Sequence, residues 1–230
     1  MELNIKIPSQ ANEIPLHLYQ SFVNDAANID TSINKSGVTE KMIEYFCAVE
    51  PDKVKLISLK SVLELNTHFD NMFNKKMPLQ RRFFLNNVEF GMIPDLENIS
   101  FEEYVDIEKY ISNWDTMNKA MAVLYRPIVE KKGDKYLIEK YQGSANYSDV
   151  MLYAPTSIAL SSTVFFWNLG QELLQATVNY LKVETKKMSK TFLVKDNLQE
   201  NGDGISQSIL SLEDALRNLT PLQPYPLINV

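Results

Sequence analysis

The densest group of residues that could do acid–base or metal chemistry is a run of carboxylates, Glu102, Glu103, Asp106 and Glu108. Glu102 and Asp106 are four residues apart, so in a helix they share a face. A helix that bridges metal ions through carboxylates needs a Glu-x-x-His pair, and this stretch contains no histidine. Acidic residues in the first turn of a helix are also explained by the helix dipole. We therefore interpret these carboxylates as a helix start rather than as a catalytic or metal site.

The two histidines and the single cysteine are the other groups that could bind a metal or act as a nucleophile. His17 and His68 lie far apart in the sequence, and metal sites need several converging ligands, so packed or surface histidines are favoured. Cys47 lies on the apolar side of a predicted helix with no base nearby, which favours a small buried residue over a nucleophile. A single cysteine forms no internal disulfide, which suits a reducing compartment.

The stretch from Gln199 to Gly204 is weakly similar to a calcium-binding loop. Its first ligand position holds Gln199 instead of Asp, and its twelfth holds Leu210 instead of Glu, so a flexible turn is the better interpretation. The sequence contains no Walker loop, dinucleotide fingerprint, nucleophile elbow or zinc-ligand spacing. We therefore predict no catalytic residues, no cofactor and no metal, and we expect that the chain is not an enzyme.

The composition is that of an ordinary globular protein. The 230 residues are 45% hydrophobic and 23% charged, which is enough for one sizeable domain or two small ones. The net charge of −6 argues against broad nucleic-acid binding, which needs a basic surface. The N-terminus lacks a basic region followed by an apolar core, so we expect no signal peptide. The most apolar stretch, 158–169, is shorter than the roughly 20 residues that cross a bilayer, so we expect no membrane partner.

The elements that would position these residues form an α+β fold, predominantly helical, with a helical core and a small β-hairpin or sheet. Helices are predicted from Pro15, over Thr39–Val49, Ser58–Phe73, Ser100–Ser112, Thr116–Tyr125 and Thr156–Val183, and over Ser206–Asn218. Strands are predicted at Leu3–Ile7, in a hairpin of 82–85 and 88–93, and at Tyr136–Ile138. Residues 143–149 are interpreted as a polar linker, and Pro51 as the end of the second helix.

Three local patterns carry most of this prediction. Asn86-Asn87 separates the two arms of the hairpin, and asparagine tolerates the positive φ of a two-residue turn. Ser100 and Glu103 are spaced as a capping box at the start of a helix whose inner face should hold Tyr104, Ile107, Ile111 and Trp114. The helix 58–73 should have its inner stripe at Leu59, Val62, Leu63, Asn66, Phe69 and Phe73.

Three regions follow from these elements. Residues 1–150 form an α+β region, 151–185 a long apolar core helix of the same domain, and 186–230 a mobile segment, a short helix and an extended proline-rich tail. A weak echo divides the first region into two pseudo-repeated halves, 1–78 and 79–150. In each half a tyrosine follows a Pro or Ser opening, and a Met-rich helix then ends in Ala-Val. A true repeat and a coincidence between amphipathic helices explain this echo equally well.

Aromatic residues mark the candidate interface. Phe165, Phe166 and Trp167 stand together in the long apolar helix, and Tyr225 lies in the proline-rich tail. Aromatic residues at this density in a long helix are more often core than a binding platform. The alternative is a subunit interface, where Trp and Tyr are enriched.

Segments 93–106, 118–128 and 164–170 resemble virion-associated proteins of crAss-like tailed bacteriophages and related phages of Bacteroidetes hosts. The likeness covers roughly residues 5–181 and brings no functional residues with it. It implies a non-enzymatic virion structural protein, made in the host bacterial cytoplasm, in a head-to-tail connector or tail-barrel ring. Its partners would be further copies of itself and other virion proteins, with no sequence-specific nucleic-acid binding. The alternatives are a protein packaged in the particle and a tail-assembly chaperone that is absent from the finished particle.

Overall fold

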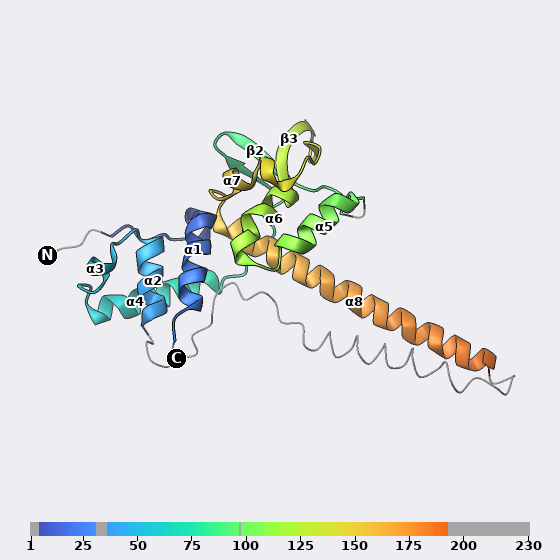
Figure 1. Cartoon of the computed structure of the whole chain (residues 1–230), viewed down its shortest axis with the longest axis horizontal. Coiled ribbons are helices and arrows are strands. Elements are labelled where there is room, and N and C mark those ends of the chain that lie inside the picture. Colours follow the sequence, from blue (N-terminus) through green and yellow to red (C-terminus); the bar gives the residue numbers. More distant parts are fainter. Residues whose placement is uncertain (1–4, 31–35, 97, 193–230) are drawn as a thin grey trace. The chain divides into compact units, whose positions relative to one another are not determined.

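The computed structural model describes residues 5–30, 36–96 and 98–192, and these residues fall into two compact units (Figure 1). The first unit ends at Thr163 and the second begins at Val164. Both residues belong to a single helix, α8 (Thr156–Phe192). The boundary therefore lies inside the helix that we expected to belong wholly to the first domain.

The first unit consists of helices and one small sheet. Its first half holds α1 (Leu16–Ala27), α2 (Gly37–Phe46), α3 (Pro51–Val54) and α4 (Leu59–Phe73). Its second half holds α5 (Phe101–Tyr110), α6 (Met117–Leu124) and α7 (Ser148–Met151). Short 3-10 turns lie at Ala11–Glu13 before α1, and at Trp114–Thr116 and Ser144–Asn146 in the second half. The predicted α+β fold with a predominantly helical core is confirmed.

The sheet has four antiparallel strands in sequential order. They are β1 (Arg82–Leu85), β2 (Val88–Met92), β3 (Tyr125–Lys132) and β4 (Lys135–Ile138). The predicted hairpin is confirmed, because Leu85 pairs with Val88 across the turn. Asn86 and Asn87 have φ values of 48° and 65°, as the two-residue turn of a twisted hairpin requires.

Strand β3 was not predicted. We expected a helix as far as Tyr125, ended by Arg126-Pro127, but α6 stops at Leu124 and the strand begins at the next residue. Pro127 sits inside this strand opposite Phe90, and its carbonyl accepts a hydrogen bond from Glu139 N at 2.9 Å. A proline in a strand lacks only the backbone N–H donor and can still accept a hydrogen bond through its carbonyl. The prediction that Pro127 ends the regular structure here was therefore wrong.

Two groups of contacts hold the first unit together. An aromatic cluster joins α1, α2 and α4 to the turn before α6, with ring centroids 5.0 Å apart for Tyr19 and Trp114 and 4.9 Å apart for Phe22 and Phe46. The start of α8 is joined to the start of α1, because Thr156 N donates to the carbonyl of Ile14 at 2.9 Å. Segments more than 140 residues apart in sequence therefore close the core.

Three further predictions on local structure were wrong. Residues 5–8 form no strand, and Ile7 is 45% exposed. Residues 143–149 are not a plain linker, since a 3-10 turn and the start of α7 lie there. Pro51 begins α3 instead of ending the second helix, which stops at Phe46, two residues before the positive φ of Ala48. Alternation needs a neighbouring strand to become a ladder, and none lies beside residues 5–8 among the described residues.

The internal repeat stays a prediction. All four strands come from 82–138, whereas the described part of 1–78 has only an isolated bridge, between Pro15 and Pro155. The two halves therefore do not share one order of elements. No helix within the described ranges is long and apolar enough to cross a membrane. In the same ranges no three His, Cys, Asp or Glu residues are grouped as metal ligands would be.

Candidate interaction surfaces

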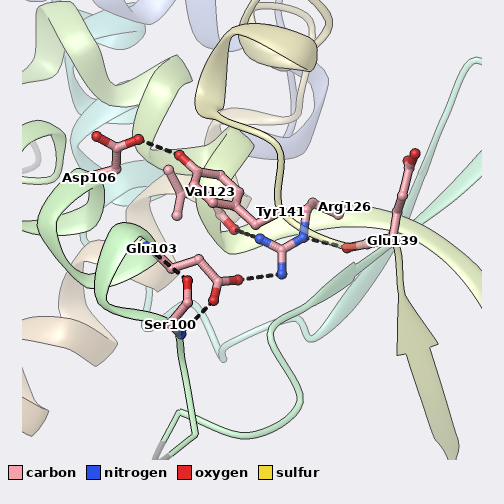
Figure 2. A network of polar contacts seen from close by, with 7 residues as sticks. All are labelled: Ser100, Glu103, Asp106, Val123, Arg126, Glu139 and Tyr141. Atoms are coloured by element: carbon pink, nitrogen blue, oxygen red, sulfur yellow. Dashed lines mark hydrogen bonds and ion pairs between the residues drawn. The ribbon is translucent and has the colours of Figure 1, made fainter.

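A buried polar cluster of the first unit surrounds Arg126, at the start of β3 (Figure 2). Its guanidinium Nη2 donates to Glu103 Oε1 at 2.6 Å, Nη1 donates to the carbonyl of Val123 at 3.0 Å, and Nε donates to that of Glu139 at 2.8 Å. The side chains of Arg126 and Glu103 are only 7% and 10% exposed. The buried cation therefore has partners on α5, on α6 and beyond β4.

Glu103 also belongs to the predicted capping box, which is confirmed. Ser100 N donates to Glu103 Oε2 at 2.7 Å, and Glu103 N donates to Ser100 Oγ at 3.2 Å. Burial on its own raises the pKa of Glu103, but hydrogen bonds from Ser100 and Arg126 outweigh it and hold this pKa below its ordinary value. The carboxylate therefore stays charged at neutral pH and ties the start of α5 to β3.

Two tyrosines complete the network. The Arg126 guanidinium lies 5.3 Å from the ring centroid of Tyr141, and the Tyr141 hydroxyl donates to Asp106 (Figure 2). Burial and this hydrogen bond raise the pKa of Tyr141. The hydroxyl of Tyr147 donates to the Glu139 carboxylate, and this bond, with burial, raises the pKa of Tyr147 to about 12. Both tyrosines are therefore protonated at neutral pH.

This network is built to position α5. General acid–base catalysis needs a group that exchanges a proton with substrate and whose pKa lies near the working pH. Glu103 and Asp106 instead accept hydrogen bonds from Arg126 and Tyr141 of the same chain, and Arg126 also donates to the carbonyls of Val123 and Glu139. The carboxylates of Glu103 and Asp106, which we predicted to mark the start of a helix, therefore also fix the position of α5 against the rest of the unit.

The anchored helix α5 turns an apolar face to solvent. Phe101, Tyr104 and Val105 are 81%, 51% and 41% exposed, and their spacing places them on one side of the helix. We call these three residues the α5 patch. We had predicted Tyr104 on the inner face with Ile107 and Trp114; the latter two are buried, but Tyr104 is not. The buried position next to it is taken by the charged Glu103, which a hydrophobic pattern does not reveal.

A second exposed apolar surface lies on α4 and the turn before it. Leu56, Leu59 and Leu63 are 68%, 72% and 59% exposed, and we call them the α4 patch. Leu59 and Leu63 were predicted on the inner stripe of this helix, which is wrong. The inner residues are Leu65, Phe69, Met72 and Phe73. The helix is apolar on both sides, so its pattern did not identify the face that packs on the core.

A groove of about 860 Å³ runs beside the α4 patch. Its apolar walls come from the N-terminal segment, the turn before α4 and α4 itself, as Ile5, Ile7, Leu56, Ile57 and Leu65. Its polar side chains already have partners: Ser58 and Ser61 hydroxyls lie 2.9 Å apart, and His68 Nε2 lies 2.8 Å from the carbonyl oxygen of Pro8. A groove with apolar walls and polar groups that are already hydrogen-bonded is better suited to bind apolar side chains of another protein than a polar substrate.

Cys47 and His17, which were also considered as a nucleophile and a ligand, lie in packed surroundings. Cys47 is buried, and burial raises the pKa of its thiol to about 11, so little thiolate is present at neutral pH. His17 Nδ1 lies 2.9 Å from the carbonyl oxygen of Leu152, and its ring centroid lies 5.1 Å from that of Tyr153.

The predicted aromatic interface falls in the second unit. Phe165, Phe166 and Trp167 are half-buried residues of α8, and the rings of Phe165 and Phe166 are 5.3 Å apart in an edge-to-face contact. Successive helix residues point about 100° apart, so the three cannot form one flat platform. The indole Nε1 of Trp167 is buried with no hydrogen-bond partner. Tyr225 lies outside the described residues, so its role remains a prediction.

Comparison of the chain with protein-family models, curated proteins and solved structures finds no match. The function is therefore argued from the surfaces of the chain itself. The α4 patch and the α5 patch carry no signal in the sequence beyond an excess of apolar residues on amphipathic helices. Only their exposure in the folded chain distinguishes them from core.

Proposed function

We propose that this chain is a non-enzymatic structural protein of a bacteriophage particle that assembles through apolar surfaces into a homo-oligomeric ring. Its place in the particle is the head-to-tail connector or the tail barrel. The observation that carries the assembly role is the α4 patch, with three leucines that are each more than half exposed beside an apolar groove. The phage assignment is supported by the resemblance of segments 93–106, 118–128 and 164–170.

Exposed leucines at this density favour association. Burying one such side chain is worth roughly 2 kcal/mol, so three together supply several kcal/mol toward an interface. Large contiguous apolar patches on soluble chains mark binding sites. Lys60, Glu64 and Thr67 line the same outer side of α4, with Lys60 Nζ and Glu64 Oε1 3.9 Å apart. A polar edge around an apolar centre is the usual anatomy of a protein–protein interface.

Self-assembly is tested by mass photometry of the purified chain at micromolar concentration. The unmodified protein is expected to form a species several times the monomer mass. A Leu59→Glu/Leu63→Glu variant is expected to remain monomeric, because two charges are placed in the centre of the α4 patch. The matched control is Phe84→Glu, a single charge at a residue that is 68% exposed on β1, and it should assemble normally. A strictly monomeric unmodified chain contradicts self-assembly in solution.

The place in the particle is tested by mass spectrometry of purified virions. A structural protein is expected there in a fixed copy number that is a multiple of a ring order. A small and variable copy number would instead identify packaged cargo. Absence from virions, with the chain bound to a tail protein in the infected cell, would contradict the virion proposal and identify a tail-assembly chaperone.

A further inference from the structure

The two exposed apolar surfaces of the first unit lie on helices at the two ends of a series of packing contacts. Helix α4 packs on α2, α2 on α1, α1 on α6, and α6 on α5 (Figure 1). The α4 patch lies on the first helix of this series and the α5 patch on the last. All six residues of the two patches are more than 40% exposed. A copy of the chain can therefore engage one neighbour through α4 and another through α5.

A closed ring places a specific demand on its subunits. When a surface binds the same surface of a second copy about a two-fold axis, assembly stops at the dimer. A ring of more than two copies needs a heterologous contact, in which a surface of one copy binds a different surface of the next. The α4 patch and the α5 patch are two such different surfaces, since the first is made of leucines and the second mainly of aromatic side chains.

The two surfaces are also complementary in form. The α4 patch borders the groove of about 860 Å³, so this side of the interface is hollowed. On the other side, Phe101 is the first residue of α5 and is 81% exposed. The capping box of Ser100 and Glu103 and the ion pair with Arg126 hold this helix start in place. An aromatic side chain on a fixed helix start is the kind of anchor that fills an apolar groove on a partner.

Lysines stand beside the α4 patch. Lys55 directly precedes Leu56, is exposed, and has no ion pair with any residue that the structure describes. Lys60 directly follows Leu59, and its only ion pair within the described ranges is the long, exposed one with Glu64. Such an exposed pair is worth little, so both ammonium groups can pair with carboxylates of another copy.

Carboxylates stand beside the α5 patch. Glu102 and Glu108 are exposed residues of α5, and neither has an ion pair among the residues with described positions. Two α5 patches facing each other would bring these carboxylates together, and like charges across an interface disfavour binding. The lysines beside the α4 patch are the opposite charge. The charges therefore favour a contact between α5 and α4 over a contact between two α5 helices.

We propose that the α5 patch of one copy binds the α4 patch of the next copy, with Phe101 in the groove beside it, and that this one contact, repeated, closes the ring. The occupant of the groove is thus a second copy of this chain. The inference rests on the proposed function, because it specifies which two surfaces the ring uses.

Two variants that complement each other test this contact. The α4 variant is Leu59→Glu/Leu63→Glu, and the α5 variant is Phe101→Glu/Tyr104→Glu. All four residues are exposed, so circular dichroism should show unchanged folding and melting for both. By mass photometry each variant alone should be a monomer, because each lacks one half of the contact.

An equal mixture of the two variants should form a species of two chains and nothing larger. The intact α5 patch of the α4 variant binds the intact α4 patch of the α5 variant, and the two altered patches prevent further growth. The matched control is Phe84→Glu/Leu137→Glu, at two exposed residues of β1 and β4, which should assemble like the unmodified chain.

The outcomes separate this inference from the proposed function. If the unmodified chain assembles but the α5 variant assembles equally well, or the mixture stays monomeric, the pairing of the two patches is overturned and self-assembly stands. An α4 variant that remains monomeric beside an assembling α5 variant would identify a two-fold contact between α4 patches. A strictly monomeric unmodified chain would contradict self-assembly itself, and the pairing with it.

Charge reversal on the same mixture tests the orientation of the contact. Lys55→Glu/Lys60→Glu is added to the α5 variant, and Glu102→Lys/Glu108→Lys to the α4 variant. Reversal on one side should raise the dissociation constant of the mixed dimer roughly tenfold, whereas reversal on both sides should restore it. Lys132→Glu/Lys135→Glu, a facing pair on β3 and β4, is the control and should have a smaller effect. Failure of the two-sided reversal to restore binding would overturn the pairing.

Discussion

The ring of Tyr136 on β4 packs over Gly91 on β2, so close that a Cβ at position 91 would lie 2.5 Å from Cε2 of Tyr136. The same Cβ would lie 2.9 Å from Cγ1 of Ile128 on β3. The Tyr136 hydroxyl donates to the carbonyl of Met92 at 2.8 Å, which holds the ring in place. A glycine inside a strand weakens it, but here it makes room for an aromatic ring that covers the sheet.

Gly91→Ala is expected to lower the free energy of unfolding by about 1–3 kcal/mol, the cost of forcing extra volume into a packed site. Urea denaturation followed by circular dichroism measures this loss. The matched comparison is the same substitution in a Tyr136→Ala background, where it should cost clearly less because the ring is gone. An equal cost in both backgrounds would show that the Tyr136 contact is not the cause.

Breaking the buried ion pair from either side should be costly. Arg126→Met leaves the Glu103 carboxylate buried without its partner, and Glu103→Leu leaves the Arg126 guanidinium buried without its partner. Each variant is expected to lower the free energy of unfolding by about 3–5 kcal/mol. The double variant should cost less than the sum of the two, because no uncompensated charge remains. Lys60→Ala is the control for an exposed pair, and it should change stability by less than about 1 kcal/mol. Additive losses in the double variant would contradict direct coupling.

The pair also predicts how stability changes in acid. The pKa of Glu103 lies below its unfolded value of 4.5. Its contribution is therefore fully present above that pH and is lost as the pH falls through the lower folded pKa. Thermal unfolding measured from neutral to acidic pH should show a smaller acid-induced fall for Glu103→Gln than for the unmodified chain. Parallel curves for the two proteins would contradict this role of Glu103.

The buried Tyr125 hydroxyl predicts how the stability of the fold changes at alkaline pH. Burial raises the pKa of Tyr125 to about 12, and its hydroxyl donates to the carbonyl of Gln80 at 2.9 Å. Its contribution is present below its unfolded pKa of 10.0 and is lost as the pH rises through about 12. Tyr125→Phe should therefore flatten the fall in stability above pH 10, as measured by unfolding at fixed urea. Absorbance at 295 nm should show one fewer late-ionising tyrosine in that variant, and an unchanged titration would count against the assignment.

The turn of the first hairpin gives a prediction on local conformation. Asn87 has a φ of 65°, in the left-handed region, which costs a β-branched residue roughly 1–2 kcal/mol. Asn87→Val is expected to lower the melting temperature, and Asn87→Gly to retain it. Val88→Thr, at the neighbouring exposed position with extended backbone, serves as the control and should have little effect. Equal melting temperatures for the valine and glycine variants would contradict the strain.

Local signals predicted much of the fold. The hairpin turn at Asn86-Asn87 and the capping box of Ser100 and Glu103 depend on residues within four positions of one another, and both are confirmed. The start of α8 after Pro155 is confirmed for the same reason. Both partners of each such interaction lie within one short segment of the sequence. The local amino-acid pattern is therefore enough to predict it.

The candidate surfaces could not be predicted in the same way. Leu59 and Leu65 both lie on apolar sides of α4, yet one is 72% exposed and the other is buried. Which side packs depends on where α2 lies, and that position is set by contacts among residues distant in sequence. Strand β3 was missed because a central proline is disfavoured in isolation, whereas the pairing with β2 and β4 tolerates it.

The sequence by itself determined the absence of a recognisable catalytic motif, the hairpin turn at Asn86-Asn87, and the capped start of α5 with its carboxylate cluster. Only the tertiary structure decided what that cluster does, because Glu103 meets Arg126 across 23 positions of the chain. It also decided which apolar residues remain on the surface. The physical reason is that capping and turn geometry act within one turn of chain, whereas burial and ion pairing depend on which distant segments meet.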